Sequence, residues 1–330
     1  MRGCVNSYRA AAVLALLSAL VLAAPARGQE EAMSGDSLGL VPLTDMGDSR
    51  YRGFQGGLYG GGKNAPPPAH VALARRQLAR IEPLGPDGSP SADGKIVLIS
   101  IGMSNTTMEF GSFKEIADAS PLKSPNVLIV DTAQGGRTAA AWANSLPEGA
   151  RSESGGTVWD EADRRIKAAG ATPAQVQAVW IKVAGRVRSG WLEEYRGDLV
   201  KIACLARARY PSLKIAYFSS RIYAGYATTR LNPEPWSYEG GFAVQQVIQQ
   251  QMSGDSRLSV EDGKAPVLLW GPYLWADGIK PRKLDGLIWN RSDFAADGTH
   301  PSRAGRGKVA RMLLKFFTTD PLARSWFCGE

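Results

Sequence analysis

The sequence predicts a single α/β/α domain built around a parallel β-sheet, and two observations support this fold class. Five short apolar runs are nearly continuous rather than alternating, as expected of strands that are buried on both faces. Turn residues and then a longer amphipathic stretch follow each run, so strands and helices alternate along the chain. The five predicted strands span residues 95–101, 126–131, 176–183, 214–219 and 266–270.

Helical periodicity fills the intervals between these strands. The pattern predicts helices over residues 159–169, 191–209, 241–252 and 302–317. Before the first strand, residues 29–91 form a Gly/Pro-rich N-terminal arm without strong periodicity, which we expect to wrap the domain as an extended segment. Apolar residues at helical spacing predict one short helix in this arm, over residues 70–81.

Residues 1–28 have the pattern of a signal peptide. Arg2 and Arg9 precede an unbroken small and apolar run from 10 to 24, and small residues at Ala24 and Ala26 suit cleavage. Because the run has 15 residues, it is shorter than the roughly 20 that a membrane-spanning helix needs. We expect an exported protein, periplasmic or secreted, without stable membrane insertion after signal removal. An uncleaved N-terminal anchor is the alternative.

The charge and the cysteines limit the classes of partner. The formal net charge of +8 falls to +6 when Arg2 and Arg9 leave with a signal cleaved after Ala26, and no run of five or more basic residues is present. Nucleic acid is therefore not an expected partner. Cys204 and Cys328 remain after processing and could either pair or stay as thiols. No further ligands stand at metal-binding spacing, so the sequence predicts no metal and no other cofactor.

A serine follows the first predicted strand at a tight turn. The chain reads Ile-Gly-Met-Ser-Asn-Thr over residues 101–106, and Gly102 lets the backbone bend so that the Ser104 hydroxyl stands exposed. In such a sheet, chemistry gathers at the carboxyl ends of the strands. A serine hydroxyl is a weak nucleophile until a neighbouring base accepts its proton. Ser104 is therefore the candidate nucleophile, provided that a base lies close to it.

The candidate base is His300, one of only two histidines in the chain. The other, His70, lies in the proline-rich arm. His300 stands in Asp-Gly-Thr-His-Pro-Ser, immediately before the last amphipathic helix, and Pro301 suits the first turn of that helix. Asp297 is three residues upstream, where a loop can direct its carboxylate at the imidazole. One short segment thus supplies a base and a carboxylate to orient it.

Together, Gly-x-Ser-Asn after a strand and Asp-Gly-Thr-His-Pro-Ser near the C-terminus resemble the first and last motif blocks of SGNH hydrolases, the GDSL-like esterases. The resemblance spans about residues 95–317, so we assign 92–330 to an SGNH-type hydrolase domain. It implies a flavodoxin-like sheet of strand order 2-1-3-4-5. Asparagine after the serine is closer to the carbohydrate acetylesterase branch than to the GDSL lipases.

The resemblance also implies an oxyanion hole. The family's second block follows the second strand, where Gly136, or less favourably Gly135, would join the Ser104 N–H as a donor. The third block departs from the family pattern, because no asparagine follows the third strand. Asn105 and Lys182 are the nearest replacements, although Lys182 could simply be a strand-end lysine that reaches water. Three literal Gly-Asp-Ser tripeptides, at residues 35–37, 47–49 and 254–256, follow no strand and are not candidates.

Aromatic residues crowd the later loops. Trp236 and Trp275 lie in polar surroundings where they could stack on sugar rings, with Arg221 as a further substrate contact. We therefore predict a serine esterase that removes ester groups, O-acetyl above all, from a small-molecule or glycan substrate. A catalytically weak glycan-binding protein with the same fold is one alternative. A lipid esterase or thioesterase, which needs a larger apolar pocket, is the other.

Overall fold

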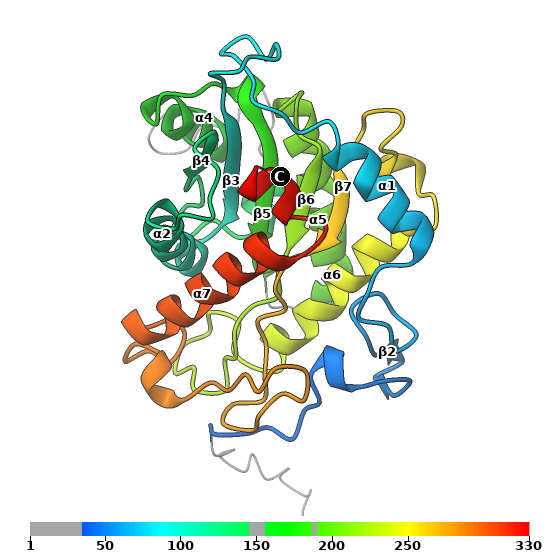
Figure 1. Ribbon diagram of the computed structural model, residues 1–330. Coiled ribbons are helices and arrows are strands. Elements are labelled where there is room, and N and C mark those ends of the chain that lie inside the picture. The colour runs from blue at the N-terminus through cyan, green and yellow to red at the C-terminus, as the bar shows by residue number, and fades with distance from the viewer. Residues whose placement is uncertain (1–34, 145–155, 187–189, 330) are drawn as a thin grey trace, which may run out of the picture. The chain divides into compact units, whose positions relative to one another are not determined.

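The five apolar runs form one parallel sheet in the computed structural model, which describes residues 35–144, 156–186 and 190–329 (Figure 1). The sheet order is β4-β3-β5-β6-β7, which is the predicted order 2-1-3-4-5 when the strands are counted along the sheet's own sequence. The fold-class prediction is therefore confirmed. The strands are β3 (Ile96–Gly102), β4 (Val127–Val130), β5 (Val176–Lys182), β6 (Ile215–Phe218) and β7 (Val267–Trp270).

The two longest strands lie beside each other inside the sheet. All seven residues of β3 and all seven of β5 are buried, which is why their sequences are almost entirely apolar. Their register pairs Gly102 with Lys182 at the carboxyl end. The segments that follow these two strands therefore start from the same edge of the sheet.

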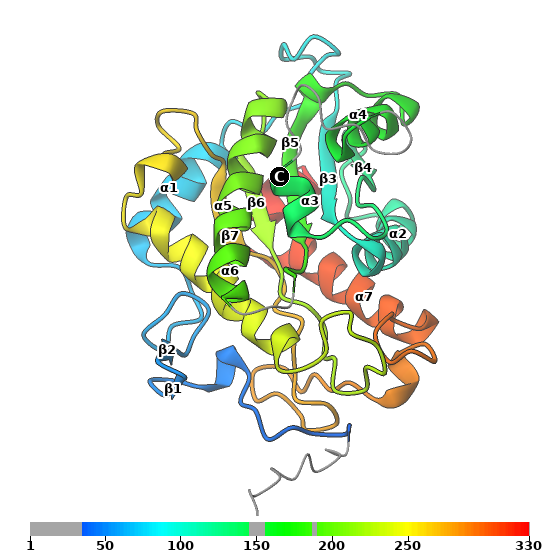
Figure 2. The same cartoon turned by 180° about the vertical axis from the view of Figure 1, so that it is seen from behind.

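Helices cover both faces of the sheet and give the three predicted layers (Figures 1 and 2). Helices α2, α7 and α8 pack together on one face, and α3, α4, α5 and α6 pack on the other, while α1 contacts β6 and β7. The helices are α1 (Pro68–Leu78), α2 (Ser104–Asp118), α3 (Ala139–Ala143), α4 (Val158–Ala168), α5 (Trp191–Arg209), α6 (Trp236–Met252), α7 (Arg303–Thr319) and α8 (Arg324–Cys328).

The helix predictions agree with the structure where the periodic segment is long. Helix α5 has the predicted bounds, and α4 and α7 lie within one or two residues of theirs. Helix α6 begins at Trp236, before the predicted residue 241, because the apolar face continues through Tyr238. Helix α1 ends at Leu78 instead of residue 81. The two five-residue helices, α3 and α8, are too short to show a helical period in sequence.

The N-terminal arm, from residue 35 on, packs against the rest of the domain over much of its length. The Asp277 carboxylate accepts hydrogen bonds from the Leu38 and Gly39 N–H groups, at 2.8 and 3.0 Å, and so fixes the start of the arm. A short antiparallel pair, β1 (Arg50–Tyr51) and β2 (Phe54–Gln55), follows. His70 of α1 is buried, with its Nε2 atom 2.8 Å from the Leu268 carbonyl oxygen of β7. The described residues from 35 on make one compact unit that includes this arm.

Some sequence predictions fall outside the part of the chain that the structure describes. The predicted signal peptide, residues 1–28, is among them. None of the helices in the described ranges is long and apolar enough to cross a membrane.

Cys204 and Cys328 do not form a disulfide, and the Cys204 thiol instead lies 3.3 Å from the Arg257 carbonyl oxygen. Within the same described ranges, no cluster of His, Cys, Asp or Glu is arranged to hold a metal ion.

Candidate active site

The turn that carries Ser104 requires glycine at the end of β3. A Cβ atom on Gly102 would lie 2.3 Å from both the Lys182 carbonyl oxygen and the Thr106 hydroxyl oxygen, which no side chain can tolerate. Helix α2 begins at Ser104, directly after this close approach. Met103, the N-cap residue, supplies no capping hydrogen bond. The serine therefore stands at a helix N-terminus whose backbone N–H groups favour negative charge.

The structure brings Ser104, His300 and Asp297 together in a continuous hydrogen-bonded chain. The Ser104 Oγ atom lies 2.9 Å from His300 Nε2, and His300 Nδ1 lies 2.6 Å from Asp297 Oδ2. Because the carboxylate can only accept, we assign the imidazole proton to Nδ1. Nε2 is then the acceptor for the serine hydroxyl. This is the geometry in which a histidine can take a proton from a serine.

Asp297 is held in its ionised form. Its Oδ1 atom accepts hydrogen bonds from the backbone N–H groups of Thr299 and His300, at 2.9 and 3.0 Å, while Oδ2 faces the imidazole. Partial burial opposes ionisation, but the hydrogen bonds from His300 and Thr299 outweigh it and lower the pKa of Asp297 to about 2. The carboxylate therefore stays negative at neutral pH and can stabilise a protonated imidazole.

A neighbouring segment fixes the loop that carries the base. Gly298 has φ +63°, and a Cβ atom there would lie 1.7 Å from the Tyr226 carbonyl oxygen. The Thr228 N–H donates to the Asp297 carbonyl oxygen at 3.0 Å. Beyond the loop, the Ser302 hydroxyl caps α7 by accepting from the Gly305 N–H. The residues after β6 and the first turn of α7 thus hold the Asp297–His300 segment from two sides.

The loop after β4 lies beside the nucleophile. The Gln134 N–H donates to the Gly102 carbonyl oxygen at 3.1 Å and so ties this loop to the end of β3. A Cβ atom on Gly135 would lie 4.0 Å from the Ser104 Cβ, whereas Gly136 has φ +73° and open space around it. Gly135 is therefore the glycine in contact distance of Ser104, and Gly136 provides the turn.

Asn105 has a different position from the predicted one. Its side chain is 1% exposed, and Nδ2 donates to the Thr299 carbonyl oxygen at 2.9 Å. The amide thus connects the first turn of α2 to the loop that carries His300, and we no longer assign it to the oxyanion hole. This contact joins residues 194 positions apart, so local sequence gives no signal for it.

Both sequence interpretations of Lys182 are wrong. The side chain is fully buried rather than reaching water, and its Nζ atom is paired with the Glu109 carboxylate of α2 instead of serving as an oxyanion donor. Burial lowers the pKa of Lys182 to about 8, against the attraction of Glu109. Val183, Ala184 and Gly185 follow β5, where the sequence resemblance predicts an asparagine, and none of them has a polar side chain.

Two of the three predicted substrate contacts are corrected by burial. Trp275 is 0% exposed and its Nε1 donates to Glu234 Oε1 at 2.7 Å, so it is a core residue and cannot stack on a sugar. The desolvation of Glu234 raises the pKa of its carboxyl to about 7. Arg221 is 5% exposed and Nη1 donates to the Leu231 carbonyl oxygen at 3.3 Å. Trp236 is half-buried at the start of α6 and stays a candidate contact.

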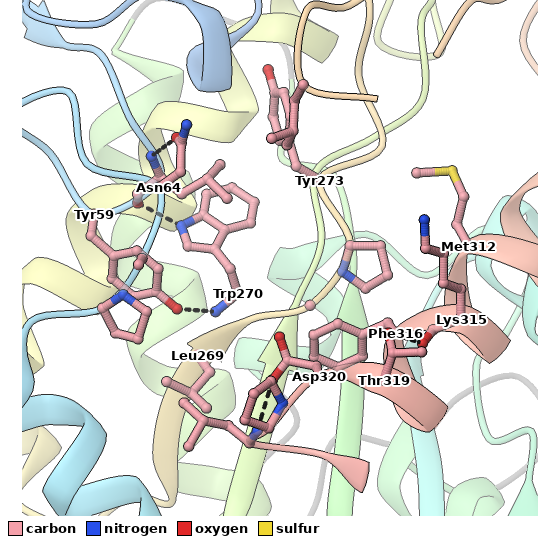
Figure 3. Close-up of a pocket in the computed structure, with 18 of the residues that line it drawn as sticks. Tyr59, Asn64, Leu269, Trp270, Tyr273, Met312, Lys315, Phe316, Thr319 and Asp320 are labelled. Atoms are coloured by element: carbon pink, nitrogen blue, oxygen red, sulfur yellow. Dashed lines mark hydrogen bonds between the residues drawn. The ribbon is translucent and has the colours of Figure 1, made fainter. Parts of the chain in front are cut away.

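A cavity of about 780 Å³ lies elsewhere, between α1, α7 and the end of β7 (Figure 3). Trp270, Tyr273, Phe316 and Met312 give it a largely apolar wall, and none of the predicted site residues contributes to it. Its volume falls within the range of small-molecule pockets. It contains no histidine or serine, and therefore no nucleophile and base of the kind found at the end of β3.

Sequence reasoning missed several polar residues, one on the helix that carries Ser104 and two beside the loop that carries His300. Glu109 is 0% exposed although it is a carboxylate, and it stands beside the buried Phe110 on α2. A carboxylate on an apolar helix face was the sequence signal that could have indicated a buried charge. Thr228 and Thr229 contact the base loop from a segment without regular structure, so no periodicity marked them.

Comparison with known proteins gives weak likeness. No protein-family model matches the chain, and no curated protein matches it. Among solved structures, a candidate acylhydrolase from Bacteroides fragilis aligns at a TM-score of 0.39 with 12% identity, over 79% of this chain and 100% of that one. A gut microbial diltiazem-metabolizing enzyme aligns at 0.35 with 12% identity, over 70% of this chain and 48% of that one. Similarity of this extent assigns no family, and the case for a function comes from the geometry of the site.

Proposed function

We propose that this chain is a serine ester hydrolase of the SGNH type, with Ser104 as nucleophile, His300 as general base and Asp297 as the carboxylate that orients it. The observation that carries the proposal is the pair of distances in series, 2.9 Å from Ser104 Oγ to His300 Nε2 and 2.6 Å from His300 Nδ1 to Asp297 Oδ2. The three residues meet from two segments almost 200 positions apart, and one of them is a histidine in a chain that has only two.

In the first half of the reaction, Ser104 Oγ attacks the ester carbonyl carbon while its proton moves to His300 Nε2. The carbonyl oxygen becomes an oxyanion. When the tetrahedral species collapses, the bond to the alcohol breaks and the alcohol oxygen takes the proton from His300. The acyl group stays on Ser104 as an ester, and the ionised Asp297 stabilises the imidazolium that forms in between.

In the second half, water replaces the alcohol. His300 Nε2 accepts a proton from water, the resulting hydroxide attacks the acyl carbon, and the bond to Ser104 Oγ breaks. The serine takes the proton back from His300, and the carboxylic acid leaves. The backbone N–H of Ser104, with that of Gly135 or Gly136, would stabilise the oxyanion of both tetrahedral species.

We further propose a short acyl group, acetyl above all, on a carbohydrate as the substrate class. Support comes from the Gly-x-Ser-Asn form of the first block and from Trp236, a half-buried aromatic residue at the start of α6. The pattern of residues 1–28 supports export as the route to such a substrate. With Trp275 in the core, the aromatic support for a sugar rests on Trp236.

The first test is hydrolysis of 4-nitrophenyl acetate, butyrate and octanoate by the mature protein and by the Ser104→Ala and His300→Ala variants. The proposal predicts that both variants lose turnover and that acetate is the preferred ester. Ser256→Ala is the matched control. Ser256 belongs to a literal Gly-Asp-Ser tripeptide, its side chain is exposed, and it lies outside the two segments that form the triad. Its activity should equal that of the wild type.

Each other outcome changes the assignment. Undiminished turnover in Ser104→Ala would remove the serine mechanism. Rates that rise steeply with acyl length would favour the lipid esterase or thioesterase. Glycan binding without any hydrolysis by the wild type would favour the binding protein. The three esters and the two variants, with a glycan-binding measurement on the wild type, thus separate the serine esterase, the lipid esterase or thioesterase and the binding protein.

A further inference from the structure

Three charged side chains lie buried together close to the triad without taking part in the proposed chemistry. Glu109 of α2 and Lys182 at the end of β5 are both 0% exposed, and Arg221, three residues after β6, is 5% exposed. Lys182 Nζ pairs directly with the Glu109 carboxylate. Arg221 is near enough for its charge to favour ionised Glu109 and to oppose protonation of Lys182. We call these residues the buried charge cluster.

The buried charge cluster is costly to keep. Glu234 is a second carboxyl whose charge acts on Arg221. Burying charges requires close pairing and hydrogen bonds. Some polar atoms have no hydrogen-bond partner within the described residues: Glu109 Oε1, Arg221 Nε and Arg221 Nη2. Apolar residues of the same size would fill this space at lower cost. A cluster of this kind calls for a role other than stability.

On one side, the cluster is connected to the nucleophile. Glu109 stands four residues after Asn105 on α2, a spacing that puts both side chains on one face of the helix. The Thr106 hydroxyl donates to the Lys182 carbonyl oxygen, which fixes the first turn of α2 to the end of β5. The Asn105 amide extends from this turn to the Thr299 carbonyl oxygen, next to His300. The first turn of α2, which includes Ser104, is thereby tied both to β5 and to the base loop.

On the other side, the cluster is connected to the base through the segment after β6. Arg221 Nη1 donates to the Leu231 carbonyl oxygen at 3.3 Å and so holds residues 221–231 in a closed turn. Two residues of that turn contact the base loop. The Thr229 hydroxyl lies 3.0 Å from the Thr299 hydroxyl, and the Thr228 N–H donates to the Asp297 carbonyl oxygen. The charged side chains therefore adjoin both halves of the hydrogen bond between Ser104 and His300: the Glu109–Lys182 pair joins α2 to β5, and Arg221 closes the segment that contacts the base loop.

We infer that Glu109, Lys182 and Arg221 are positioning residues, which fix α2 and the segment 221–231 to each other and so hold His300 within hydrogen-bond distance of Ser104. The catalytic meaning of this inference rests on the proposed function, but the positional claim does not. The three residues touch no reacting atom. Glu109 and Lys182 act through the ion pair that joins α2 to β5, and Arg221 acts through the Leu231 carbonyl oxygen.

The test uses Arg221→Met, which keeps the length of the side chain and removes its charge, and Arg221→Lys, which restores a charge without the planar fork. With only two histidines in the chain, the proton NMR signal of the His300 Nδ1–H can be distinguished from that of His70. We expect the His300 signal of Arg221→Met to shift or broaden, while the His70 signal is unchanged. We also expect kcat to fall about ten- to a hundredfold with little change in KM, because misplacement of a reacting group affects the chemical step.

A second variant protects the test against misfolding. Thr229→Val removes the hydroxyl contact with Thr299 without touching a buried charge, and should move the His300 signal and kcat in the same direction by a smaller factor. Thr318→Val is the control, since its hydroxyl bonds within α7 to the Leu314 carbonyl oxygen. If Arg221→Met does not fold, Thr229→Val decides.

The inference is overturned if the folded variants show a wild-type His300 signal and wild-type kcat. Partial recovery of kcat in Arg221→Lys relative to Arg221→Met would support it, because a merely space-filling role would make lysine no better than methionine. If the wild type hydrolyses no ester, the proposed function fails, and the NMR signal alone still tests the positional claim. The two failures are therefore distinguishable.

Discussion

An enzyme site usually combines reactive side chains with a cavity for the substrate. In this molecule, these two properties lie in two different regions along the β-sheet. The region at the end of β3 has a nucleophile, a base and an ionised carboxylate in hydrogen-bonded sequence. The region at the end of β7 has a cavity of about 780 Å³ with an aromatic wall (Figure 3). In the first, the contacts place a serine, a histidine and a carboxylate in series; in the second, the contacts, such as that of Trp270 Nε1 with the Leu58 carbonyl oxygen, hold the wall of the cavity. Volume is therefore a poor guide to chemistry in this molecule, and the arrangement of charges is a better one.

Among the changes that distinguish the triad from the cavity, Asp297→Asn should have the largest effect on kcat. The amide would offer an N–H to the imidazole where the carboxylate accepts one, so His300 would be held in the wrong tautomer. We expect kcat to fall by about 10⁴-fold, measured on 4-nitrophenyl acetate.

Asp285→Asn is the matched control for that change. Asp285 lines the cavity and pairs with Arg282, so it is also an aspartate that accepts a hydrogen bond from a basic side chain. Its variant should hydrolyse the ester at the wild-type rate. Equal losses in the two variants would mean that the cavity and the triad belong to one site.

A smaller effect is expected from Lys182→Met, beneath the triad. The change leaves the Glu109 carboxylate buried without its ion-pair partner, which costs about 3 to 5 kcal/mol where one partner of a buried pair has been removed. Unfolding by urea should show this loss of stability. Lys315→Met, at an exposed lysine on the cavity rim, should change the stability little. Equal stability of the two variants would show that the buried ion pair contributes no more than a surface charge.

The same contrast explains what could be predicted from sequence. Local rules predict the strands and the triad, Ser104, His300 and Asp297. A buried strand, a glycine turn and a three-residue loop each depend on residues adjacent in the sequence. The position of Trp275 follows no such rule, because a tryptophan in a polar stretch can face either the core or solvent. Its burial depends on Glu234, 41 residues away, which accepts its indole N–H.

The oxyanion hole shows the same limit. Replacement of the third-block asparagine by Asn105 or Lys182 was a reasonable expectation from position alone. The structure instead gives each side chain a distant partner, Thr299 for Asn105 and Glu109 for Lys182. Contacts between segments far apart in the chain depend on the whole fold, and periodicity contains no information about them. The triad was accessible to sequence reasoning because most of it lies in one short loop.

The pH dependence of stability should have opposite signs in the two regions. Hydrogen bonds lower the pKa of Asp297 below the ordinary value of 3.8, to about 2, whereas burial raises the pKa of Asp320 in the cavity wall above that value. Ionised Asp297 therefore adds stability above pH 4, and this contribution is lost as the pH falls toward 2. Ionised Asp320 subtracts stability at neutral pH, and its penalty disappears as the pH falls toward 3.8.

Thermal unfolding of two variants checks these signs. Asp297→Asn should lower the melting temperature at pH 7, and the difference from wild type should shrink between pH 4 and pH 2. Asp320→Asn should raise it at pH 7, because an amide can still accept the Leu322 N–H that Asp320 Oδ1 now accepts at 2.8 Å. That gain should vanish on approach to pH 4. Shifts of the same sign at pH 7 would contradict the opposite environments of the two carboxyls.

The smallest expected effect comes from filling the cavity. Met312 of α7 is half-buried and lines the cavity wall, so Met312→Trp adds volume where space exists. If the two regions are independent, kcat/KM for 4-nitrophenyl acetate should stay within about twofold of wild type, since distant sites without shared partners act almost additively. A loss of tenfold or more would couple the cavity to the triad through α7, whose first turn follows His300 directly. The triad and the cavity would then act as one site, although they lie apart in the structure.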